Sequence, residues 1–139
     1  MAAIVEPSQV TILLADDDLE ILRITRTRLA KRGFNLIEAH DGEEALEQAM
    51  TEQPHLVVLD VMMPKLNGWE VCKYLRERES YEEMGVLMLT AIGPSLNELT
   101  SPLYGADEHL DKPFDLGELD AAVDRILEKR CGIRLAANV

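Results

Sequence analysis

The sequence contains few cysteines, and this limits its redox chemistry. Only Cys72 and Cys131 occur among 139 residues, far apart in the sequence. We therefore expect two reduced thiols in a reducing compartment and no disulfide framework. Because Cys72 falls on the apolar side of an expected helix, we assign it to core packing rather than to a redox role.

Long apolar runs and basic residues are also scarce. No run approaches the roughly 18 apolar residues of a membrane span, and the first residues, which include Glu6 and Pro7, lack the regions of a signal peptide. We therefore expect a cytoplasmic protein with no membrane partner. Fourteen basic residues against 26 acidic ones give a net charge of −12. This charge repels phosphate backbones, so we expect no direct nucleic-acid binding by this chain.

The apolar residues that are present can fill one domain core, and they alternate regularly along the chain. Hydrophobic residues make up 47% of the sequence, which at this length supports a single core. Strand-like apolar runs cover residues 10–15, 34–39, 55–59, 86–89 and 108–110. Segments with helical spacing cover residues 19–31, 42–51, 68–78 and 116–129. Asp41 and Asp115 precede two of these segments and are the expected N-caps.

This alternation predicts the fold class. Strands that alternate with helices form a parallel sheet with right-handed crossovers, and the helices then cover both faces. Five such units fit an open, doubly wound α/β sheet, because a closed eight-stranded barrel needs about 250 residues. We divide the chain into an N-terminal extension (1–9), one domain (10–130) and a tail or linker (131–139), and expect residues 133–139 to be frayed.

Polar side chains stand at the carboxyl ends of four of these strands. Asp16 and Asp17 follow the first run, Asp60 follows the third, Thr90 the fourth and Lys112 the fifth. In open α/β sheets, ligands bind outside the carboxyl ends of the strands. We therefore expect these five side chains to converge on one edge of the sheet.

The three consecutive aspartates, Asp16, Asp17 and Asp18, have two interpretations. Their charges repel one another unless a cation offsets them, and Mg²⁺ prefers clustered carboxylate oxygens. Taken alone, the run is better explained as a turn with a helix N-cap, because Asp suits both roles. The other polar groups at the same edge reverse this balance and favour a metal site.

The groups at this edge suit phosphoryl transfer. Asp16 and Asp17 can hold Mg²⁺, which neutralises phosphoryl charge, while Lys112 offers a mobile positive charge and Thr90 a hydrogen-bond donor. Asp60 then remains as the nucleophile. Its attack on phosphorus would give an aspartyl phosphate, a covalent intermediate of known chemical type.

Four stretches of sequence carry a resemblance to a known family. They are ILLADDD (12–18), VVLDVMMPKLNGWE (57–70), LTA (89–91) and GADEHLDKPF (105–114). In these stretches, and in their order, the chain resembles the receiver domain of bacterial two-component response regulators over about residues 10–129. The resemblance implies a flavodoxin-like fold with a five-stranded parallel sheet of order 2-1-3-4-5.

The resemblance also implies roles for the acidic residues. Asp60 is the expected phosphoacceptor. Asp16, Asp17 and Asp60 are the expected Mg²⁺ ligands, together with the backbone carbonyl of Met62. We expect Asp18 to cap the first helix rather than to touch the metal.

Further roles follow for residues around the acidic cluster. By resemblance, Thr90 hydrogen-bonds the phosphoryl group and Lys112 pairs with its oxygens. Pro113 corresponds to the family's cis-proline, which aims that lysine into the site. Pro64 and Gly68 match the turn after the phosphorylated strand.

The implied function is a phosphorylation-dependent signalling switch rather than an enzyme that turns over an external substrate. A sensor histidine kinase or a phosphotransfer protein would supply the phosphoryl group. A downstream protein would bind the face formed by the fourth helix, the fifth strand and the last helix.

The chain departs from the family pattern in its switch region. His109 stands where the family usually carries the Tyr or Phe that moves with Thr90, so coupling is weaker or pH-dependent unless His109 is simply exposed on an edge strand. Pro94 and Pro102 predict a short fourth helix at about residues 95–100, because proline is not tolerated in the middle of a helix.

Two positions beside the site bear on the lifetime of the phosphorylated state. Met62 and Ile92 are apolar where the family positions a hydrolytic water. We therefore expect slow self-hydrolysis of the aspartyl phosphate.

Basic residues also gather on the first helix. They form either a docking patch for a partner or a solvated face with support from Glu20 to Arg23, and we favour the solvated face. The residues are Arg23, Arg26, Arg28, Lys31 and Arg32.

Two other functions account for parts of the pattern. A pseudo-receiver that binds partners without phosphorylation would explain His109 and Pro102, but the intact polar site argues against it. A haloacid-dehalogenase-like phosphatase also uses an Asp nucleophile, and Asp16 with Asp18 superficially fits its spacing. The chain is short for that family, and Asp60 would go unexplained.

Overall fold

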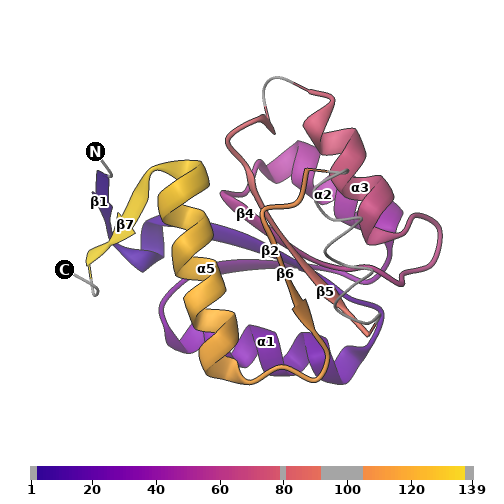
Figure 1. Cartoon of the computed structure of the whole chain (residues 1–139), viewed down its shortest axis with the longest axis horizontal. Coiled ribbons are helices and arrows are strands. Elements are labelled where there is room, and N and C mark those ends of the chain that lie inside the picture. The colour runs from indigo at the N-terminus through magenta and orange to yellow at the C-terminus, as the bar shows by residue number, and fades with distance from the viewer. Residues whose placement is uncertain (1–2, 79–80, 92–104, 137–139) are drawn as a thin grey trace.

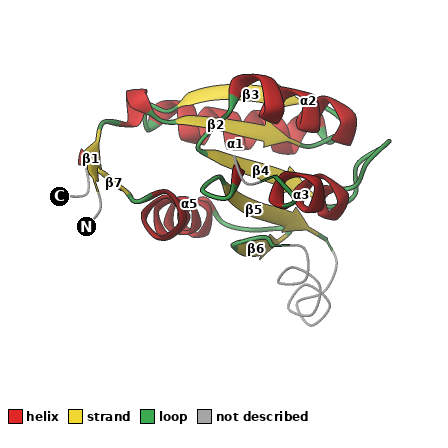
Figure 2. Cartoon of the chain, turned by 90° about the horizontal axis from the view of Figure 1, so that it is seen from above, coloured by secondary structure: helices red, strands yellow, loops and turns green. Residues whose placement is uncertain are grey.

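The molecule is built on a five-stranded parallel sheet (Figure 1). The computed structural model describes residues 3–78, 81–91 and 105–136. The strands of the sheet are β2 (Thr11–Ala15), β3 (Asn35–Ala39), β4 (Leu56–Asp60), β5 (Gly85–Thr90) and β6 (Glu108–Asp111). Their order across the sheet is β3-β2-β4-β5-β6 (Figure 2). This is the predicted order 2-1-3-4-5, counted from β2 as the first strand of the sheet.

Helices cover both faces of the sheet, as the sequence predicts. They are α1 (Leu19–Lys31), α2 (Gly42–Glu52), α3 (Gly68–Arg76) and α5 (Leu116–Cys131). Figure 1 shows α2 and α3 on one side of the sheet and α1 and α5 on the other. Two separate apolar clusters result, one with side chains of α1 and α5 and one with side chains of α2 and α3.

Burial follows the sequence pattern strand by strand. Every residue of β4 is buried, and so is every residue of β2 after Thr11. Strands with both faces covered read as continuous apolar runs, which is how these two read in the sequence. Strand β3 lies at the edge and is only partly buried. The central strands therefore hold their carboxyl ends rigidly between two helical layers.

Side-chain caps fix where the helices begin. The Asp18 carboxylate accepts hydrogen bonds from the backbone N–H groups of Glu20 and Ile21, at the start of α1. Asp41 and Asp115 cap α2 and α5 in the same way. These three caps confirm the predicted N-cap roles. The boundaries of the helices agree with the predicted ones to within two residues.

The cysteines are consistent with the expected packing role. Cys72 is fully buried among the apolar residues of α3, and burial raises the pKa of its thiol to about 11. Cys131, at the end of α5, is also a free thiol. Within the described ranges, no helix has the length and apolar character needed to cross a membrane.

One part of the fold differs from the prediction. Ile133–Leu135 forms strand β7 and pairs in parallel with β1 (Ala3–Val5), which is followed by the short 3-10 helix η1 (Pro7–Gln9). The expectation of a frayed end is therefore wrong for residues 133–135, because alternate apolar side chains there are buried. The assignment of residues 1–9 and 131–139 as extension and tail remains a prediction.

The predicted fourth helix lies in a segment outside the described residues. Residues 92–104, which include Ile92, Pro94 and Pro102, lie outside the described residues. The prediction of a short helix at about residues 95–100 therefore stays a prediction. The described residues continue from Gly105, before β6.

Candidate functional site

Three carboxylates meet at the carboxyl ends of the two central strands. Strands β2 and β4 are adjacent and parallel, with Ala15 opposite Leu59. Asp16 and Asp17 follow β2 directly and Asp60 ends β4, so these three residues reach the same edge. Each offers a carboxylate oxygen, and the three oxygens lie within 4.8 Å of one another. The structure thus brings together the three aspartates that the sequence singles out.

Lys112 adds a positive charge to this acidic cluster. Its Nζ donates hydrogen bonds to Asp16 Oδ2 at 2.9 Å and to Asp60 Oδ1 at 3.2 Å. Lys112 follows β6, and its backbone N–H donates to the Thr90 carbonyl at 2.7 Å. The Lys112–Pro113 peptide bond is cis, which agrees with the expectation from the sequence.

Burial sets the electrostatics of the cluster. Asp60 is only 5% exposed and Asp16 only 2%, whereas Asp17 is exposed. Burial and then the neighbouring Asp16 charge raise the pKa of Asp60 to about 7, against the opposing effect of Lys112. Burial lowers the pKa of Lys112, but its bonds to Asp16 and the charges of both aspartates outweigh this and raise it. The cluster therefore holds an excess of negative charge out of water.

Asp18 has a different role from its two neighbours. Its carboxylate caps α1, and its backbone N–H donates to Asp16 Oδ1 at 2.9 Å, which orients that side chain. The metal-competent group contains Asp16, Asp17 and Asp60 and does not include Asp18. This arrangement favours the predicted cap over a ligand. It also removes the pairing of Asp16 with Asp18 on which the phosphatase alternative depends.

Thr90 lies on β5, next to the strand of Asp60, and His109 lies on β6, one strand further out. Thr90 is fully buried at the end of β5 and pairs in register with Asp111 of β6. His109 pairs with Met88 two positions earlier and is half-buried. The half-buried position decides neither for a His109 that moves with Thr90 nor for one that is simply exposed on an edge strand. A role of His109 in switching remains a prediction.

The turn after β4 is fixed by close backbone contacts. The Gly68 N–H donates to the Val61 carbonyl at 2.9 Å, and a Cβ on Gly68 would come within 2.5 Å of the Asp60 carbonyl oxygen. Only glycine fits this approach. The Pro64 carbonyl accepts from Gly42 N–H at 3.2 Å, which ties the turn to α2. Met62, in the same turn, has 64% of its surface exposed.

The basic residues of α1 divide into two groups. Arg28 and Arg32 bind carboxylates of α5, with Arg28 Nη2 2.7 Å from Asp120 and Arg32 Nη2 2.6 Å from Asp124. Arg23 is largely exposed, 3.9 Å from Glu20. The prediction of a solvated face thus fits Arg23 but is wrong for the two arginines that pair with α5. No local pattern in the sequence signals this pairing, because its partners lie 92 residues apart on two different helices.

An apolar groove beside the site was not anticipated from the sequence. It has a volume of about 260 Å³ and lies between α1 and the start of α5. Ile24 and Leu116 also line an adjoining hollow bordered by Arg23, Arg28 and Lys31. The groove adjoins Pro113, the residue after Lys112. Its lining residues are Ile21, Ile24, Pro113, Phe114, Asp115 and Leu116.

Comparison with known proteins supports the resemblance seen in the sequence. A family model described as the response regulator receiver domain matches residues 12–124. The probable transcriptional regulator ycf27 of Cyanophora paradoxa is 44% identical over 118 residues, which are 85% of this chain and 48% of that protein. The alkaline phosphatase synthesis transcriptional regulatory protein PhoP of Bacillus subtilis is 43% identical over the same shares. The chain thus spans about half the length of these relatives.

Solved structures agree with the sequence matches. A putative response regulator from Chloroflexus aurantiacus superposes with a TM-score of 0.82 and is 32% identical, covering 86% of this chain and 98% of that one. The Vibrio cholerae chemotaxis protein CheY4 superposes with a TM-score of 0.79 and is 30% identical, covering 85% and 98%. Almost the whole of each of these two solved chains is therefore matched by this chain.

Proposed function

Because the chain belongs to the response regulator receiver family, we propose that it is a cytoplasmic, phosphorylation-dependent switch with Asp60 as its phosphoacceptor. The observation that carries this proposal is the grouping of Asp60 with two further carboxylates and one ammonium at a single edge of the sheet. A buried nucleophile, acidic metal ligands and a mobile cation are the parts that phosphoryl transfer requires.

The donor set fits Mg²⁺. Three carboxylate oxygens within 4.8 Å of one another supply the hard ligands that this ion prefers. Asp16, Asp17 and Asp60 would hold it, with the backbone carbonyl of Met62 as the expected fourth protein ligand. When bound, the ion supplies positive charge that offsets the phosphoryl oxygens.

In the proposed reaction, a carboxylate oxygen of Asp60 forms a bond to phosphorus. The bond from phosphorus to the donor's leaving group breaks, and the leaving group departs with the electron pair. Lys112 then moves its hydrogen bonds from the Asp60 carboxylate to the transferred oxygens, and Thr90 donates a further hydrogen bond. The product is an aspartyl phosphate in a site whose charge has changed.

That change in charge would drive the switch. The phosphoryl group adds negative charge and acceptor oxygens beside Thr90, at the end of β5. Movement of Thr90 would then alter β6 and α5, the described parts of the proposed output face. His109 lies on this path on β6, so its imidazole is the proposed coupling residue. A downstream protein that binds this face would read the altered surface.

The groove between α1 and α5 is the proposed docking site for the phosphoryl donor. It joins apolar residues such as Ile24 and Leu116 to the basic side chains Arg23 and Lys31, and it ends beside Pro113. A sensor histidine kinase or phosphotransfer protein seated there would present its phosphohistidine near Asp60. The curated relatives are named as transcriptional regulators, so regulation of transcription by a longer protein is a further proposal.

The side chains of Met62 and Ile92 bear on the lifetime of the aspartyl phosphate. Met62 is apolar and Ile92 is apolar, so neither can orient an attacking water by hydrogen bonding. We expect the aspartyl phosphate to persist for much longer than seconds after the phosphoryl donor is removed.

Intact-mass spectrometry tests the phosphoacceptor assignment. We expect incubation with acetyl phosphate and Mg²⁺ to add the mass of one phosphoryl group, and Asp60→Asn to abolish the addition while keeping the circular dichroism of the parent. An Asp60→Asn protein that is labelled as readily as the parent would refute the assignment. A parent that is neither labelled nor changed in Trp69 fluorescence by beryllofluoride would instead be a phosphorylation-independent interaction module.

A further inference from the structure

The two ends of the described chain are joined to each other. Ala3, Ile4 and Val5 pair in parallel with Ile133, Arg134 and Leu135, and the Ala3 N–H donates to the Gly132 carbonyl at 2.8 Å. In Figure 1 this two-stranded ribbon projects from one end of the molecule, next to the end of α5. The ribbon therefore links the start of the chain to the segment that leaves the last helix.

The ribbon has an inner and an outer side. Ile133 is 8% exposed and Leu135 3%, and both join the apolar cluster of α1 and α5, against which Val5 also packs. Between the two inner positions of β7, Arg134 is exposed, and its partner on β1, Ile4, is 64% exposed. This alternation is that of a strand with one face on a core. The inner side chains, rather than chance proximity of the termini, hold the ribbon in place.

Both ends of the N-terminal arm, defined as residues 3–9, are anchored to the domain. At its far end, the Asn35 side-chain amide donates to the Ser8 carbonyl at 2.5 Å. At its near end, β1 binds β7 just after α5 ends at Cys131, and the next residue, Gly132, has a φ of 67° that turns the chain out of the helix. The arm thus spans from the edge strand β3 to the exit of α5.

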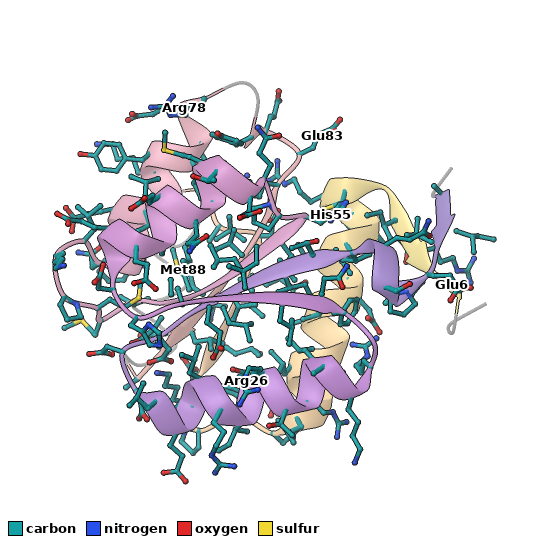
Figure 3. All side chains as sticks on the ribbon, turned by 180° about the vertical axis from the view of Figure 1, so that it is seen from behind. Glu6, Arg26, His55, Arg78, Glu83 and Met88 are labelled. Carbon is teal, nitrogen blue, oxygen red and sulfur yellow. The ribbon has the colours of Figure 1, made fainter. Side chains whose placement is uncertain are left out.

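The ribbon lies outside the part of the chain that the family model matches. The family model covers residues 12–124, so β1 and β7 both lie outside it. The ribbon also lies at the amino ends of the sheet strands, away from the site. Figure 3 shows this separation: Glu6, which follows β1, lies at one side of the molecule, and Met88, near the carboxyl end of β5, lies toward the other.

From these contacts we infer that the N-terminal arm is a strap that fixes the exit of the chain from α5. With β1 in place, the chain beyond Leu135 starts from a set position and direction on the domain. Without β1, residues 133–135 lose their ladder partner and the packing of Val5. We expect the strap to act independently of phosphorylation, because it lies beyond the amino ends of the sheet strands, whereas the acidic residues lie at their carboxyl ends.

Amide hydrogen exchange tests the strap with two matched variants. Val5→Asp places a charge on the inner side of β1, whereas Ile4→Asp places the same charge on its exposed side. We expect Val5→Asp to speed exchange of the 133–135 amides roughly tenfold or more, with labelling of Asp60 by acetyl phosphate unchanged. Ile4→Asp should alter neither measurement.

A deletion of residues 2–5 provides the second test, in case the buried charge of Val5→Asp disturbs the whole domain. The deletion should speed exchange at residues 133–135 by a similar factor and lower the heteronuclear NOE of residues 133–136, while the amides of β2 and β4 stay protected. Residues 133–135 that keep their parental protection in the deletion variant would overturn the inference. So would an equal effect of Ile4→Asp and Val5→Asp.

Discussion

At the scale of single residues, the acidic site is a compromise between stability and chemistry. Asp16 and Asp60 are both buried, and the Lys112 ammonium pairs with both but can offset only one of their two negative charges. Taking a carboxylate out of water is costly unless it is paired and hydrogen-bonded. The excess negative charge of the cluster therefore destabilises the fold, and a bound cation or protonation of a carboxylate can reduce this destabilisation. Two measurable consequences follow.

The first consequence is a pH dependence of stability without Mg²⁺. The pKa of Asp60 is raised from 3.8 to about 7 in the folded protein, so the folded state binds this proton more tightly than the unfolded state. This group stabilises the fold fully below pH 4, and its contribution is lost as pH rises toward 7. Asp60→Asn removes the loss. We expect the variant to exceed the parent by about 1–3 kcal/mol at pH 8, and by only about a quarter of that at pH 4.5, which lies slightly above the unfolded pKa.

Urea unfolding at the two pH values measures this difference. Glu47→Gln, which removes the same charge from an exposed position on α2, is the control and should show little change between pH 4.5 and pH 8. If Asp60→Asn is no more stable than the parent at pH 8, the ionised Asp60 carboxylate does not destabilise the fold as proposed.

The second consequence separates two adjacent aspartates. Asp17 belongs to the metal-competent group, whereas Asp18 caps α1. We expect Asp17→Asn to weaken Mg²⁺ binding roughly tenfold or more, because it removes a charged ligand. Asp18→Asn keeps the cap, since Asn caps as well as Asp, and should change the affinity by no more than about twofold. Isothermal titration calorimetry with MgCl₂ compares the two, and equal weakening would contradict the division of roles.

The residues of the site show how far sequence reasoning reaches at this scale. Asp16, Asp17, Asp60 and Lys112 could be placed together because parallel strands bring their carboxyl ends to one edge. The pairing of Arg28 with Asp120 could not be predicted in the same way. It depends on how α1 and α5 pack across one face of the sheet, which no local pattern records.

At the scale of elements, the start of α3 is held against the phosphoacceptor strand. Helix α3 begins at Gly68, and this position touches the backbone of Asp60 and Val61. The contact is between backbone atoms, which cannot rotate away as a flexible side chain can. The position of Asp60 and the start of α3 are therefore coupled.

A substitution at this contact should be felt in both the fold and the site. A Cβ on Gly68 would lie 2.5 Å from the Asp60 carbonyl oxygen, so Gly68→Ala must displace the turn or the helix. We expect a loss of about 1–3 kcal/mol in the free energy of unfolding, measured in urea. Gly117→Ala, at an exposed position in the first turn of α5, would bring its Cβ to 3.2 Å from a side-chain oxygen of Asp115, which can shift more easily than backbone, so it should change stability far less than Gly68→Ala. A Gly68→Ala protein as stable as the parent would show that this turn is adaptable.

Element prediction succeeded where periodicity was long enough to detect. The bounds of α1 agree residue for residue with the expected ones, since thirteen residues carry a clear apolar stripe and a capping aspartate. Strand β7 was missed because three residues are too few to show alternation against chance. Its partner β1 is equally short and lies at the opposite end of the sequence.

At the scale of the whole molecule, the acidic site and the two-stranded ribbon lie at opposite ends of the sheet strands. The carboxyl ends of the strands carry the acidic site, and the ribbon of β1 and β7 lies beyond the opposite ends. The proposed donor groove lies between α1 and the start of α5 and adjoins Pro113, beside the acidic site. A small phosphoryl donor needs only the acidic site, whereas a protein donor needs the groove as well.

This difference between donors gives a test of the groove. Ile24 lines both parts of the groove and is not one of the residues that form the acidic site. We expect Ile24→Glu to slow phosphoryl transfer from an autophosphorylated histidine kinase that labels the parent, by roughly tenfold or more. The rate from acetyl phosphate should stay within about twofold, because chemistry at Asp60 is unchanged. Leu46→Glu, which places the same charge in an apolar hollow on α2, should affect neither donor. Equal slowing with both donors would mean that Ile24 supports the fold of the site rather than the docking of a partner.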